Sequence, residues 1–391
     1  RVEIAEMACK YYGNPSSKFK RIGITGTNGK TTITYLIKSI IETAGMRIGV
    51  IGTNQNIIGD KVLVTQSTTP TTPNALELQQ LFAEMVDSDA ECVVMEVSSH
   101  ALELERVHGC HFDVGVFTNL TRDHLDFHKT MENYLNAKAK LFKISDKGVV
   151  NFDDDGGKKI VANNDCDILK VGLSDGCDLK AKNIEISSSG ADFDVEYDGK
   201  TYRVHIVIPG KFSVYNAICA MGAALQMGID MDTIIKGLEN ATGVVGRVEV
   251  VPTNTDYTVI IDYAHTPDGL ENIIKTVKDF AKGEVITLFG CGGDRDNTKR
   301  PIMGEIAGKL SDYSIITTDN PRTEIEVGMK RTDGKYKVIV DRREAIAYAL
   351  DHAKKDDVII LAGKGQETYQ IIGKEKHDFD ERVVVYKHLN K

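Results

Sequence analysis

Residues 21–32 of the chain read RIGITGTNGKTT, and this stretch decides the fold class. Its first five residues form a short apolar run, and a glycine-rich turn follows. Beyond the turn, apolar residues recur at helical spacing, namely Ile33, Leu36, Ile37, Ile40, Ile41 and Ala44. The pattern predicts a strand, a tight loop and a helix. The amides at the start of such a helix can bind phosphate oxygens.

The turn itself has the composition of a phosphate-binding loop: Gly26, Thr27, Asn28, Gly29, Lys30, Thr31 and Thr32. Lys30 would reach the terminal phosphates, and Thr31 can offer its hydroxyl to Mg²⁺. The strict GxxxxGKS/T spacing is not met, because Ile24 stands where the first glycine belongs. We interpret the turn as a variant of this loop. The alternative is a glycine-rich strand-to-helix turn with an incidental lysine.

Short apolar runs alternate with helical patterns over the first part of the chain. The runs lie at residues 47–51, 92–97 and 113–118, and helical patterns lie between and after them at residues 74–85 and 133–142. Such alternation predicts parallel strands joined by right-handed crossover helices.

The pattern changes between residues 149 and 209, where the strands become shorter and more polar. Residues 193–197 and 202–208 flank an Asp198-Gly199 turn signal, which predicts a hairpin and a small β layer. Helical periodicity returns over residues 214–238, and the turn-prone residues 241–246 follow it. A second α/β series then has strands near residues 258–263, 285–289, 313–317, 338–340 and 358–361.

A chain of 391 residues is too long for one ordinary core, so we predict two α/β domains. Residues 1–243 would form a central ATP-binding domain of the P-loop type, with a mostly parallel sheet and the small β layer. Residues 244–391 would form a Rossmann-like domain.

Composition indicates a globular protein whose partners are small molecules. The chain is 41% hydrophobic and 27% charged, and its net charge of -9 includes no run of Lys or Arg. This argues against a broad nucleic-acid or membrane surface. The seven cysteines are widely spaced without a CxxC pair, which is typical of a cytoplasmic protein and not of a disulfide framework or zinc ribbon. Residues 1–10 resemble part of a helix, and we expect a further portion of the protein to precede them.

Two clusters of polar residues follow apolar strands, where open α/β sheets bind ligands. The first contains Glu96, a candidate metal ligand that could instead be a solvated or helix-capping residue. The second is TNLTRDHLDFH, residues 118–128, where a metal or phosphate site is plausible around His124. A lone histidine is more often structural, and HxxxH is weak evidence for zinc without a third ligand. Lys138, on the next helix, would from composition alone be a solvated surface lysine.

Nine motifs occur in order along the chain: GTNGKT, TTPTTP, EVSSHAL, TNLTRDHLDFH, YLNAKAKLF, DYAHTPD, GCGGDRDNTKRP, DNPR and GKGQE. Together they resemble the Mur ligase family of peptidoglycan synthesis, from about Tyr11 to the C-terminus. Within that family they are most similar to the branch that extends UDP-N-acetylmuramoyl-L-alanyl-D-glutamate (UDP-MurNAc-L-Ala-D-Glu) by a diamino acid. Eight or more ordered motifs do not coincide by chance.

The resemblance implies an ATP-dependent amide-bond ligase that uses Mg²⁺. Lys30 and Thr31 would hold the ATP phosphates and Mg²⁺, and Glu96 and His124 match the family's metal ligands. Lys138 matches a lysine that becomes carbamylated, which would turn its ammonium into a carboxylate-like group able to support a second Mg²⁺. On this reading Lys138 is not a surface residue.

The resemblance also implies three groups of binding residues. Residues similar to those around the nucleotide are Asn216, Arg247, Asp262 and His265. Contacts to the UDP-sugar peptide are implied for Thr68, Thr69, Ser98 and Arg106. Contacts to the incoming amino acid are implied for Arg300, Asp319, Asn320, Arg322, Gly363 and Glu367.

The sequence departs from the family pattern in three respects. The family's N-terminal domain, which grips the uridine, is absent from it. The chain after Glu324 has fewer residues than the pattern leads us to expect. Gln366 stands in place of a histidine and Ser213 in place of an asparagine.

The acceptor is predicted from Arg322 and Glu367. Arg322 offers a planar fork suited to a carboxylate, and Glu367 offers a partner for an ammonium. meso-Diaminopimelate carries both groups at its distal end, whereas L-lysine carries only the ammonium. We therefore predict the diaminopimelate-adding activity in a monomeric enzyme. The alternatives are an L-lysine-adding enzyme, a ligase similar to folylpolyglutamate synthetase, and a catalytically silent nucleotide-binding scaffold.

Overall fold

The structure is a computed structural model, and it describes residues 1–59, 61–64, 71–187, 189–291, 299–317, 331–372 and 375–390. The chain divides into two compact units. Unit 1 comprises Arg1–Glu185, Ala191–Val207 and Phe212–Thr242, and unit 2 comprises Ile186–Gly190, Ile208–Lys211 and Gly243–Lys391. The long segment of unit 2 thus begins one residue before the boundary that the sequence predicts.

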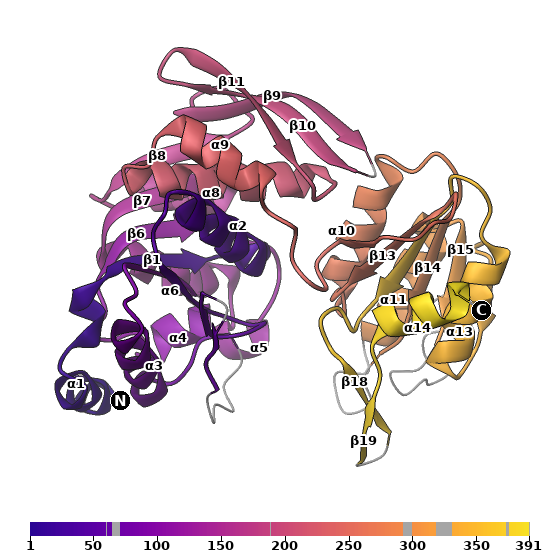
Figure 1. The fold of residues 1–391 in the computed structure, drawn as a ribbon, viewed down its shortest axis with the longest axis horizontal. Helices are drawn as coiled ribbons and strands as arrows, with labels where there is room; N and C mark the ends of the chain where they lie inside the picture. The colour runs from indigo at the N-terminus through magenta and orange to yellow at the C-terminus, as the bar shows by residue number, and fades with distance from the viewer. Residues whose placement is uncertain are drawn as a thin grey trace. The chain divides into compact units, whose positions relative to one another are not determined.

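Unit 1 is built on a single sheet in which eleven strands are described, in the order β11-β10-β9-β8-β7-β6-β1-β5-β2-β3-β4 (Figure 1). Its parallel part consists of β1 (Lys20–Thr25), β2 (Ile48–Ile51), β5 (Cys92–Glu96), β6 (Phe112–Phe117), β7 (Ser145–Asn151) and β8 (Asp167–Gly172). One edge carries the short strands β3 (Ile57–Ile58) and β4 (Lys61–Val62), and the other carries β9 (Leu179–Ser187), β10 (Gly190–Tyr197) and β11 (Lys200–Ile206).

The central strands are apolar on both faces because helices cover both. These helices are α1 (Val2–Tyr11), α2 (Lys30–Thr43), α3 (Ala75–Asp87), α4 (Ser99–Glu103), α5 (Leu125–His128), α6 (Met131–Lys143), α7 (Asp155–Ala162), α8 (Lys211–Gln226) and α9 (Met231–Glu239). Helices α3 and α6 pack on one face of the sheet, and α2, followed by α9, packs on the other. Burial on both faces is typical of parallel sheets and explains runs such as Cys92–Glu96, in which every residue is buried.

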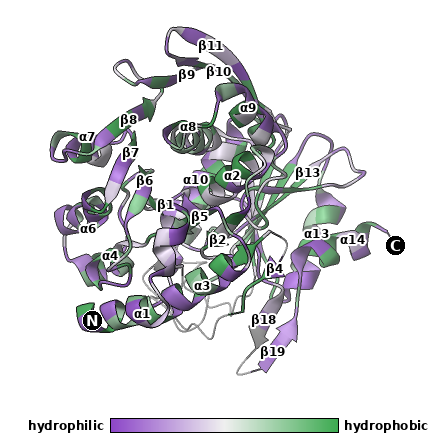
Figure 2. Cartoon of the chain, turned by 60° about the vertical axis from the view of Figure 1, so that its left-hand side comes forward, coloured by the Kyte–Doolittle hydropathy of each residue, from purple (hydrophilic) through white to green (hydrophobic). Residues whose placement is uncertain are grey.

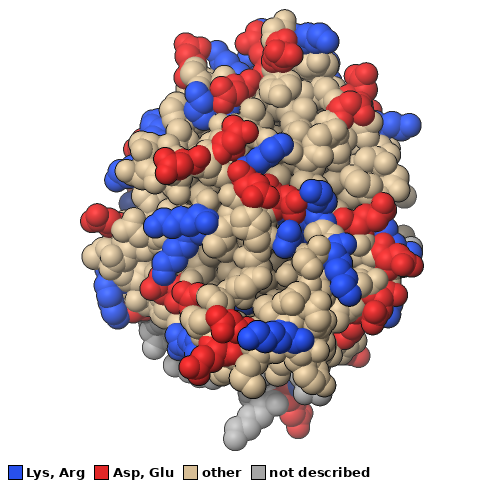
Figure 3. Space-filling view, turned by 90° about the vertical axis from the view of Figure 1, so that its left-hand side faces the viewer, with Lys and Arg blue, Asp and Glu red and all other residues tan. Residues whose placement is uncertain are grey.

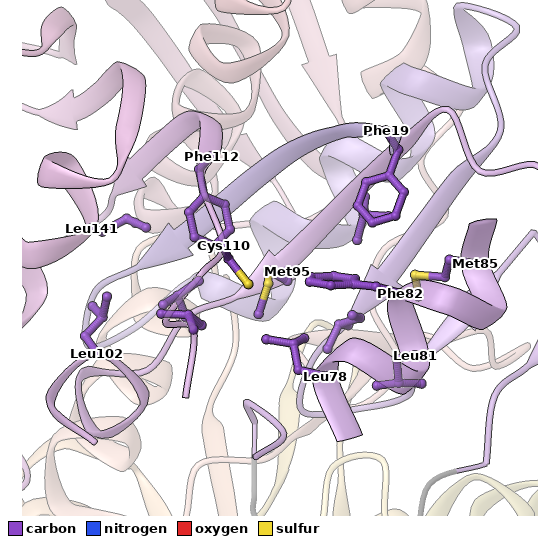
Figure 4. Close-up of a cluster of buried hydrophobic side chains, with 14 of the residues drawn as sticks. Phe19, Leu78, Leu81, Phe82, Met85, Met95, Leu102, Cys110, Phe112 and Leu141 are labelled. Atoms are coloured by element: carbon purple, nitrogen blue, oxygen red, sulfur yellow. The ribbon is translucent and has the colours of Figure 1, made fainter. Parts of the chain in front are cut away.

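The face under α3 and α6 holds a large apolar cluster (Figure 4). Phe19 and Phe82 meet in it edge to face, with ring centroids 5.3 Å apart. Helix α3 begins there because the side chain of Asn74 accepts a hydrogen bond from the amide of Glu77, at 3.1 Å. This packing fixes the carboxyl ends of β1, β5 and β6.

Strand β1 lies between β5 and β6, and all three run parallel. Ile24 pairs with Glu96 on one side and Thr25 pairs with Phe117 on the other. The three strands therefore end at the same edge of the sheet, where the strand order reverses and ligands bind in open α/β sheets. The loops that follow them carry the three polar motifs of unit 1.

Two predictions about unit 1 need correction. The hairpin around Asp198-Gly199 is present as β10 and β11, but these strands extend the edge of the central sheet and do not form a separate layer. The predicted helix over residues 214–238 is two helices, α8 and α9, with a break at Gly228, whose φ is 85°. A positive φ is what glycine permits and what ends α8.

Unit 2 contains a second sheet in the order β12-β13-β17-β14-β15-β16. Its strands are β12 (Glu249–Val251), β13 (Thr258–Asp262), β14 (Val285–Phe289), β15 (Tyr313–Ile316), β16 (Tyr336–Val338) and β17 (Val358–Ala362). All pairs are parallel except β12 with β13. The described helices are α10 (Pro267–Lys278), α11 (Lys299–Leu310), α13 (Arg342–His352) and α14 (Glu381–Leu389).

The five predicted strands of unit 2 are observed, and β16 begins two residues earlier than expected. Strand β12 and the hairpin of β18 (Tyr369–Ile372) and β19 (Glu375–Asp378) were not predicted. Figure 2 shows why for β19, which is hydrophilic along its length and lacks the alternation that marks a half-buried strand. In the described part of the chain, no helix has both the length and the apolar character needed to cross a bilayer.

Candidate active site

The loop between β1 and α2 is shaped by two glycines. Gly26 has a φ of 148° and Gly29 a φ of 89°, which side chains other than that of glycine rarely adopt. A Cβ on Gly26 would overlap the hydroxyl of Thr118, and one on Gly29 would overlap the amide oxygen of Asn216. The loop backbone is therefore packed closely against its neighbours, and α2 starts directly behind it at Lys30.

Residues after β6 hold this loop in place. The amide of Thr27 donates to the carbonyl of Asn119 at 2.9 Å, and the amide of Asn28 donates to the Asn119 side chain at 2.9 Å. The hydroxyl of Thr118 donates to the carbonyl of Asn28 at 2.7 Å. Two of the three predicted polar motifs thus form one structure.

The Lys30 ammonium lies against the inner side of the loop. Its Nζ donates to the carbonyl of Gly26 at 3.0 Å and to that of Thr27 at 2.9 Å. A positive charge and the first amides of α2 are therefore placed together, which is the combination that attracts phosphate oxygens.

Glu96 links the loop to the ends of β5 and β2. The carboxylate is 1% exposed and accepts from the Thr31 hydroxyl at 3.0 Å, from the Thr53 amide at 2.8 Å and from the Thr53 hydroxyl at 3.1 Å. The structure therefore brings Thr31 and Glu96 together, as expected for two ligands of one cation. The reading of Glu96 as a solvated residue is wrong.

Thr72 joins the TTPTTP motif to the end of β5. Its hydroxyl donates to the Glu96 carbonyl at 2.9 Å and accepts from the Ser98 amide at 3.0 Å. Its carbonyl accepts from the Arg106 guanidinium at 3.0 Å. Ser98 and Arg106 are thus neighbours, while Thr68 and Thr69 lie outside the described residues.

Lys138 is buried, with 1% of its surface exposed, so the surface-lysine reading is wrong. Its Nζ lies 4.3 Å from the centre of the Tyr134 ring. None of the residues that the structure describes offers it a hydrogen-bond acceptor or an ion-pair partner. Burial, with the nearby charge of Lys30, lowers the pKa of the Lys138 amine well below its usual range.

Two histidines, His124 and His128, contact the Tyr134 ring, and His100 packs against both of them. His128 stacks on Tyr134 with ring centres 5.0 Å apart and shares a hydrogen bond with the Ser99 hydroxyl at 2.9 Å. His124 meets His100 edge to face, with ring centres 4.8 Å apart. Burial is the main cause that lowers the pKa of His124, and Lys30 and Lys138 add to it. Burial likewise lowers the pKa of His100 to about 4.

Among the described residues, side chains alone do not complete a metal centre. No group of three His, Cys, Asp or Glu side chains that could hold a metal occurs within the described ranges. Thr31 and Glu96 supply a hydroxyl and a carboxylate oxygen, which are ligands of the kind that Mg²⁺ prefers. Further ligands would come from His124, from bound phosphate, from water or from a modified Lys138.

Unit 2 carries its predicted nucleotide residues on the turn before β12 and at the end of β13. The Asp262 carboxylate accepts from the amides of Val248 and Ala264, each at 2.8 Å, and burial raises its pKa. The Arg247 guanidinium lies 4.9 Å from the centre of the Tyr263 ring. His265 shares a hydrogen bond with the Tyr263 carbonyl at 2.8 Å. Arg247, Asp262 and His265 are thus grouped around one segment.

The structure describes only some of the residues that are predicted to bind the incoming amino acid. Gly363 follows β17 and its amide donates to the Asp262 carbonyl at 2.9 Å. Glu367, expected to face a substrate ammonium, accepts from the buried Lys364 at 3.2 Å. Arg300 is buried near the start of α11. Asp319, Asn320 and Arg322 lie outside the described residues, as does the segment after Glu324.

Sequence reasoning missed residues that shape the site. Tyr134 contacts Lys138 and also shares a hydrogen bond with the Thr27 hydroxyl at 3.2 Å. Its spacing of four residues before Lys138 on α6 was a usable signal. Thr72 lies in the TTPTTP motif but was not itself nominated. Thr53 carried no signal, because its contacts to Glu96 bridge segments distant in the chain.

The surface charges of unit 1 argue against a polyanion-binding face. Acidic and basic side chains are interspersed on the face shown in Figure 3. That distribution is typical of an ordinary solvated surface and not of a face that binds a polyanion.

Two family models match the chain. Residues 24–224 match the Mur ligase middle domain, and residues 246–365 match the Mur ligase glutamate ligase domain. These ranges contain every described residue that the sequence nominates for the site except Glu367.

The chain is similar along nearly its whole length to proteins named UDP-N-acetylmuramoyl-L-alanyl-D-glutamate–2,6-diaminopimelate ligase. It is 51% identical to one from Clostridium acetobutylicum, with 98% of this chain and 81% of that protein covered. It is 50% identical to one from Caldanaerobacter subterraneus subsp. tengcongensis, with the same coverage, and 47% identical to one from Bacillus cereus, with 97% and 80% covered.

Solved structures give the same picture. A structure of a protein with that ligase name is 35% identical and has a TM-score of 0.73, with 95% of this chain and 78% of that chain covered. A folylpolyglutamate synthase from Thermotoga maritima also has a TM-score of 0.73, with 93% of this chain and 90% of that chain covered, but it is 18% identical. The second likeness shows the fold alone.

Proposed function

The chain belongs to the Mur ligase family, and we propose that it is the ATP-dependent ligase that joins meso-diaminopimelate to UDP-MurNAc-L-Ala-D-Glu. Relatives from three genera that are 47–51% identical carry the corresponding name. The observation in the structure that supports a phosphate-transferring site most directly is the convergence of Lys30, Thr31 and Glu96 at one edge of the sheet.

The reaction requires activation because a carboxylate is negatively charged and has no leaving group. Transfer of the γ-phosphoryl group of ATP to the D-glutamate carboxylate gives an acyl phosphate and ADP. The amine of the incoming amino acid then attacks the acyl carbon, inorganic phosphate leaves, and the amine loses a proton. Catalysis of both steps depends mainly on positioning and on neutralisation of negative charge.

The loop suits the phosphates of ATP because the Lys30 ammonium and the first amides of α2 lie together at it. The loop amides and the start of α2 would bind phosphate oxygens, and Lys30 would turn from the loop carbonyls towards the terminal phosphate. Asn216 would flank the nucleotide from α8, with Thr32 on the first turn of α2. In unit 2, Arg247, Asp262 and His265 are the proposed nucleotide residues.

Mg²⁺ would be held by Thr31, Glu96 and His124, with Lys138 as a carbamate. When bound, it would neutralise phosphate charge and fix the phosphate geometry. Lys138 suits carbamylation because burial and the lowered pKa favour the neutral amine, and the neutral amine is the form that adds to carbon dioxide. The carbamate would carry a negative charge into a region where Lys30 and the bound Mg²⁺ supply positive ones.

Substrate contacts remain proposals for each residue. Ser98 and Arg106, with Thr68 and Thr69, would face the UDP-sugar peptide. Arg322, with Asp319 and Asn320, would bind the distal carboxylate of diaminopimelate. Arg300, Gly363 and Glu367 would complete that side, although Glu367 would first have to exchange Lys364 for a substrate ammonium.

We also propose that the protein acts as a monomer in the cytoplasm and binds small molecules. The interspersed surface charges of unit 1 are compatible with that. The alternatives named at the outset are weaker. A scaffold role does not account for a buried Lys138 with a lowered pKa, and the likeness to folylpolyglutamate synthase rests on the fold.

The proposal predicts ATP-dependent and amine-dependent release of phosphate when UDP-MurNAc-L-Ala-D-Glu is supplied. meso-Diaminopimelate should be used in preference to L-lysine by a factor that reflects about 2–5 kcal/mol, because lysine leaves a carboxylate-binding arginine unpaired. Product formation with each amine, measured by chromatography, checks both points. A preference for lysine would end the amine assignment, and release of phosphate without amine would end the ligase assignment.

A control separates Lys138 from the rest of the site. The variant Lys138→Ala should lose activity by roughly 10²–10³-fold and regain part of it when acetate is supplied as a small carboxylate. Carbon-13 bicarbonate should give a carbamate resonance in the wild type that is missing from this variant. A wild-type spectrum without that resonance would remove the carbamate and leave the ligase assignment intact.

A further inference from the structure

The turn that carries Arg247 packs backbone to backbone against the loop of residues 363–367. Gly246 and Gly365 face each other, with φ values of 73° and 53°. A Cβ on Gly246 would overlap the backbone of Gly365 and Gln366, and one on Gly365 would lie 2.9 Å from the Gly246 carbonyl oxygen. Because no side chain separates the two segments, neither can shift without displacing the other.

Glu249 and Arg382 tie these segments together. Glu249 Oε2 accepts from the Gly246 amide at 2.6 Å and from Arg382 Nη1 at 3.0 Å. Arg382 Nη1 also donates to the Gly365 carbonyl at 3.4 Å, and Arg382 Nε pairs with Asp380 at 2.9 Å. A single carboxylate and a single guanidinium thus connect the turn, the loop and the start of α14.

The turn is held in a conformation that it would not adopt alone. Val248 has a φ of 45°, and a β-branched residue at positive φ is strained. Such a conformation persists only where surrounding contacts over-determine it. Here the Asp262 carboxylate accepts from the Val248 amide at 2.8 Å, and the Gly246 carbonyl accepts from the Tyr263 amide at 2.9 Å. These contacts set the direction of Arg247.

We propose that Glu249 and Arg382 are positioning residues that lock the Arg247 turn to the loop of residues 363–367. This inference rests on the proposed function, in which Arg247 faces the nucleotide and Gly363 and Glu367 face the incoming amino acid. The lock makes both binding segments of unit 2 one rigid body. Binding of nucleotide therefore orders the amino-acid loop, and the two ligands bind with positive coupling.

The variant Glu249→Ala tests the lock. It removes both contacts of the carboxylate and leaves Arg382 paired with Asp380, so no buried cation loses its last partner. The KM for meso-diaminopimelate at saturating ATP should rise roughly tenfold, the factor that about 1.4 kcal/mol represents, while kcat changes much less. In the wild type, ATP should lower the KM for meso-diaminopimelate, and this effect of ATP should be lost in the variant.

Amide hydrogen exchange gives a readout that needs no catalysis. In the full chain carrying Glu249→Ala, exchange should become faster in residues 244–248 and also in residues 363–367. The exchange rate should rise in both segments because the lock joins them. Equal exchange in the variant and the wild type would overturn the inference.

Two further variants serve as matched controls. Glu249→Gln keeps an oxygen that can accept from the Gly246 amide, so it should restore part of the coupling. Glu271→Ala removes a different ion pair of unit 2, with Lys275 at 2.5 Å on α10, and should behave as the wild type.

If Glu249→Ala keeps wild-type coupling in an active ligase, the lock is wrong and the proposed function stands. If the wild type makes no amide product, the proposed function is wrong, and hydrogen exchange alone decides the lock.

Discussion

Lys138 of unit 1 and Arg342 of unit 2 are each 1% exposed, yet their surroundings differ. Arg342 Nε donates to Glu381 at 2.8 Å and its Nη2 donates to the Ala362 carbonyl at 2.8 Å. Lys138 lies over an aromatic ring, and the described side chains give its amine no acceptor. An arginine cannot lose its proton, so burial requires a partner, whereas a lysine can be neutral. Removing a buried arginine from its ion pair should therefore destabilise the fold, whereas a buried lysine amine without a described acceptor is available for chemistry.

The largest effect should come from replacing each cation by methionine. Arg342→Met removes the guanidinium that pairs with the buried Glu381 carboxylate and should reduce the free energy of unfolding by about 3–5 kcal/mol. Lys138→Met removes a desolvated amine and should change it by less than about 1 kcal/mol, or raise it. Urea unfolding, monitored separately in the two units by hydrogen exchange, measures both values.

The double variant Arg342→Met with Glu381→Leu is the control for this prediction. Replacing a whole buried ion pair by apolar residues is often close to neutral, so most of the lost stability should return. A large loss of stability in Lys138→Met would break the comparison, because it would mean that Lys138 has a structural role after all.

This difference also marks the limit of what the sequence could predict. The strand, loop and helix around Lys30 follow from local periodicity and were found. Burial of Lys138 depends on how α6 packs on the sheet, and only the family resemblance indicated it. Arg342 and Glu381 are 39 residues apart, and nothing local relates them.

The short strands show the same limit. Strand β12 has three residues and an antiparallel partner, so it carries too little pattern for detection. The edge strands β10 and β11 were predicted as strands, but the sheet that they join depends on tertiary pairing. Local signals therefore predicted the phosphate-binding loop, and long-range contacts such as that of Thr53 with Glu96 stayed hidden.

A smaller effect on stability should follow when the partners of Arg342 and Lys138 are changed and the two basic side chains are kept. Glu381→Gln preserves an acceptor for Arg342 but removes the opposite charge, and it should cost about 1–3 kcal/mol of unfolding free energy. Tyr134→Phe preserves the ring beneath Lys138 and removes only the hydroxyl bonded to Thr27, which should cost about 0.5–1.5 kcal/mol. Denaturant midpoints of the two variants provide the measurement. Equal losses would argue that charge pairing at Arg342 contributes nothing beyond an ordinary hydrogen bond.

The smallest effect concerns His100, which contacts His124 and His128, the two histidines beside the Tyr134 ring over which Lys138 lies. A titratable group in such surroundings should make stability depend on pH. The pKa of His100 is lowered to about 4, mainly by burial and then by His124 and His128. An unfolded histidine titrates near about 6.5. Below that pH the unfolded chain binds a proton that the folded chain does not, so the unfolding free energy falls as the pH drops from about 6.5 towards 4.

The variant His100→Gln should reduce the slope of the unfolding free energy against pH by an amount that corresponds to less than one proton. The change is small because His100 is partly exposed and solvent screens the effect. His124 and His128, whose pKa values are also lowered, would account for part of the remaining slope. Urea midpoints at pH 7 and at about pH 4.5, compared between wild type and variant, give the difference. Arg342 does not titrate in this range, so unit 2 supplies the reference. An unchanged slope in the variant would mean that His100 takes up its proton in the folded chain. Burial near Lys138 would then penalise a positive charge less than burial around Arg342 does.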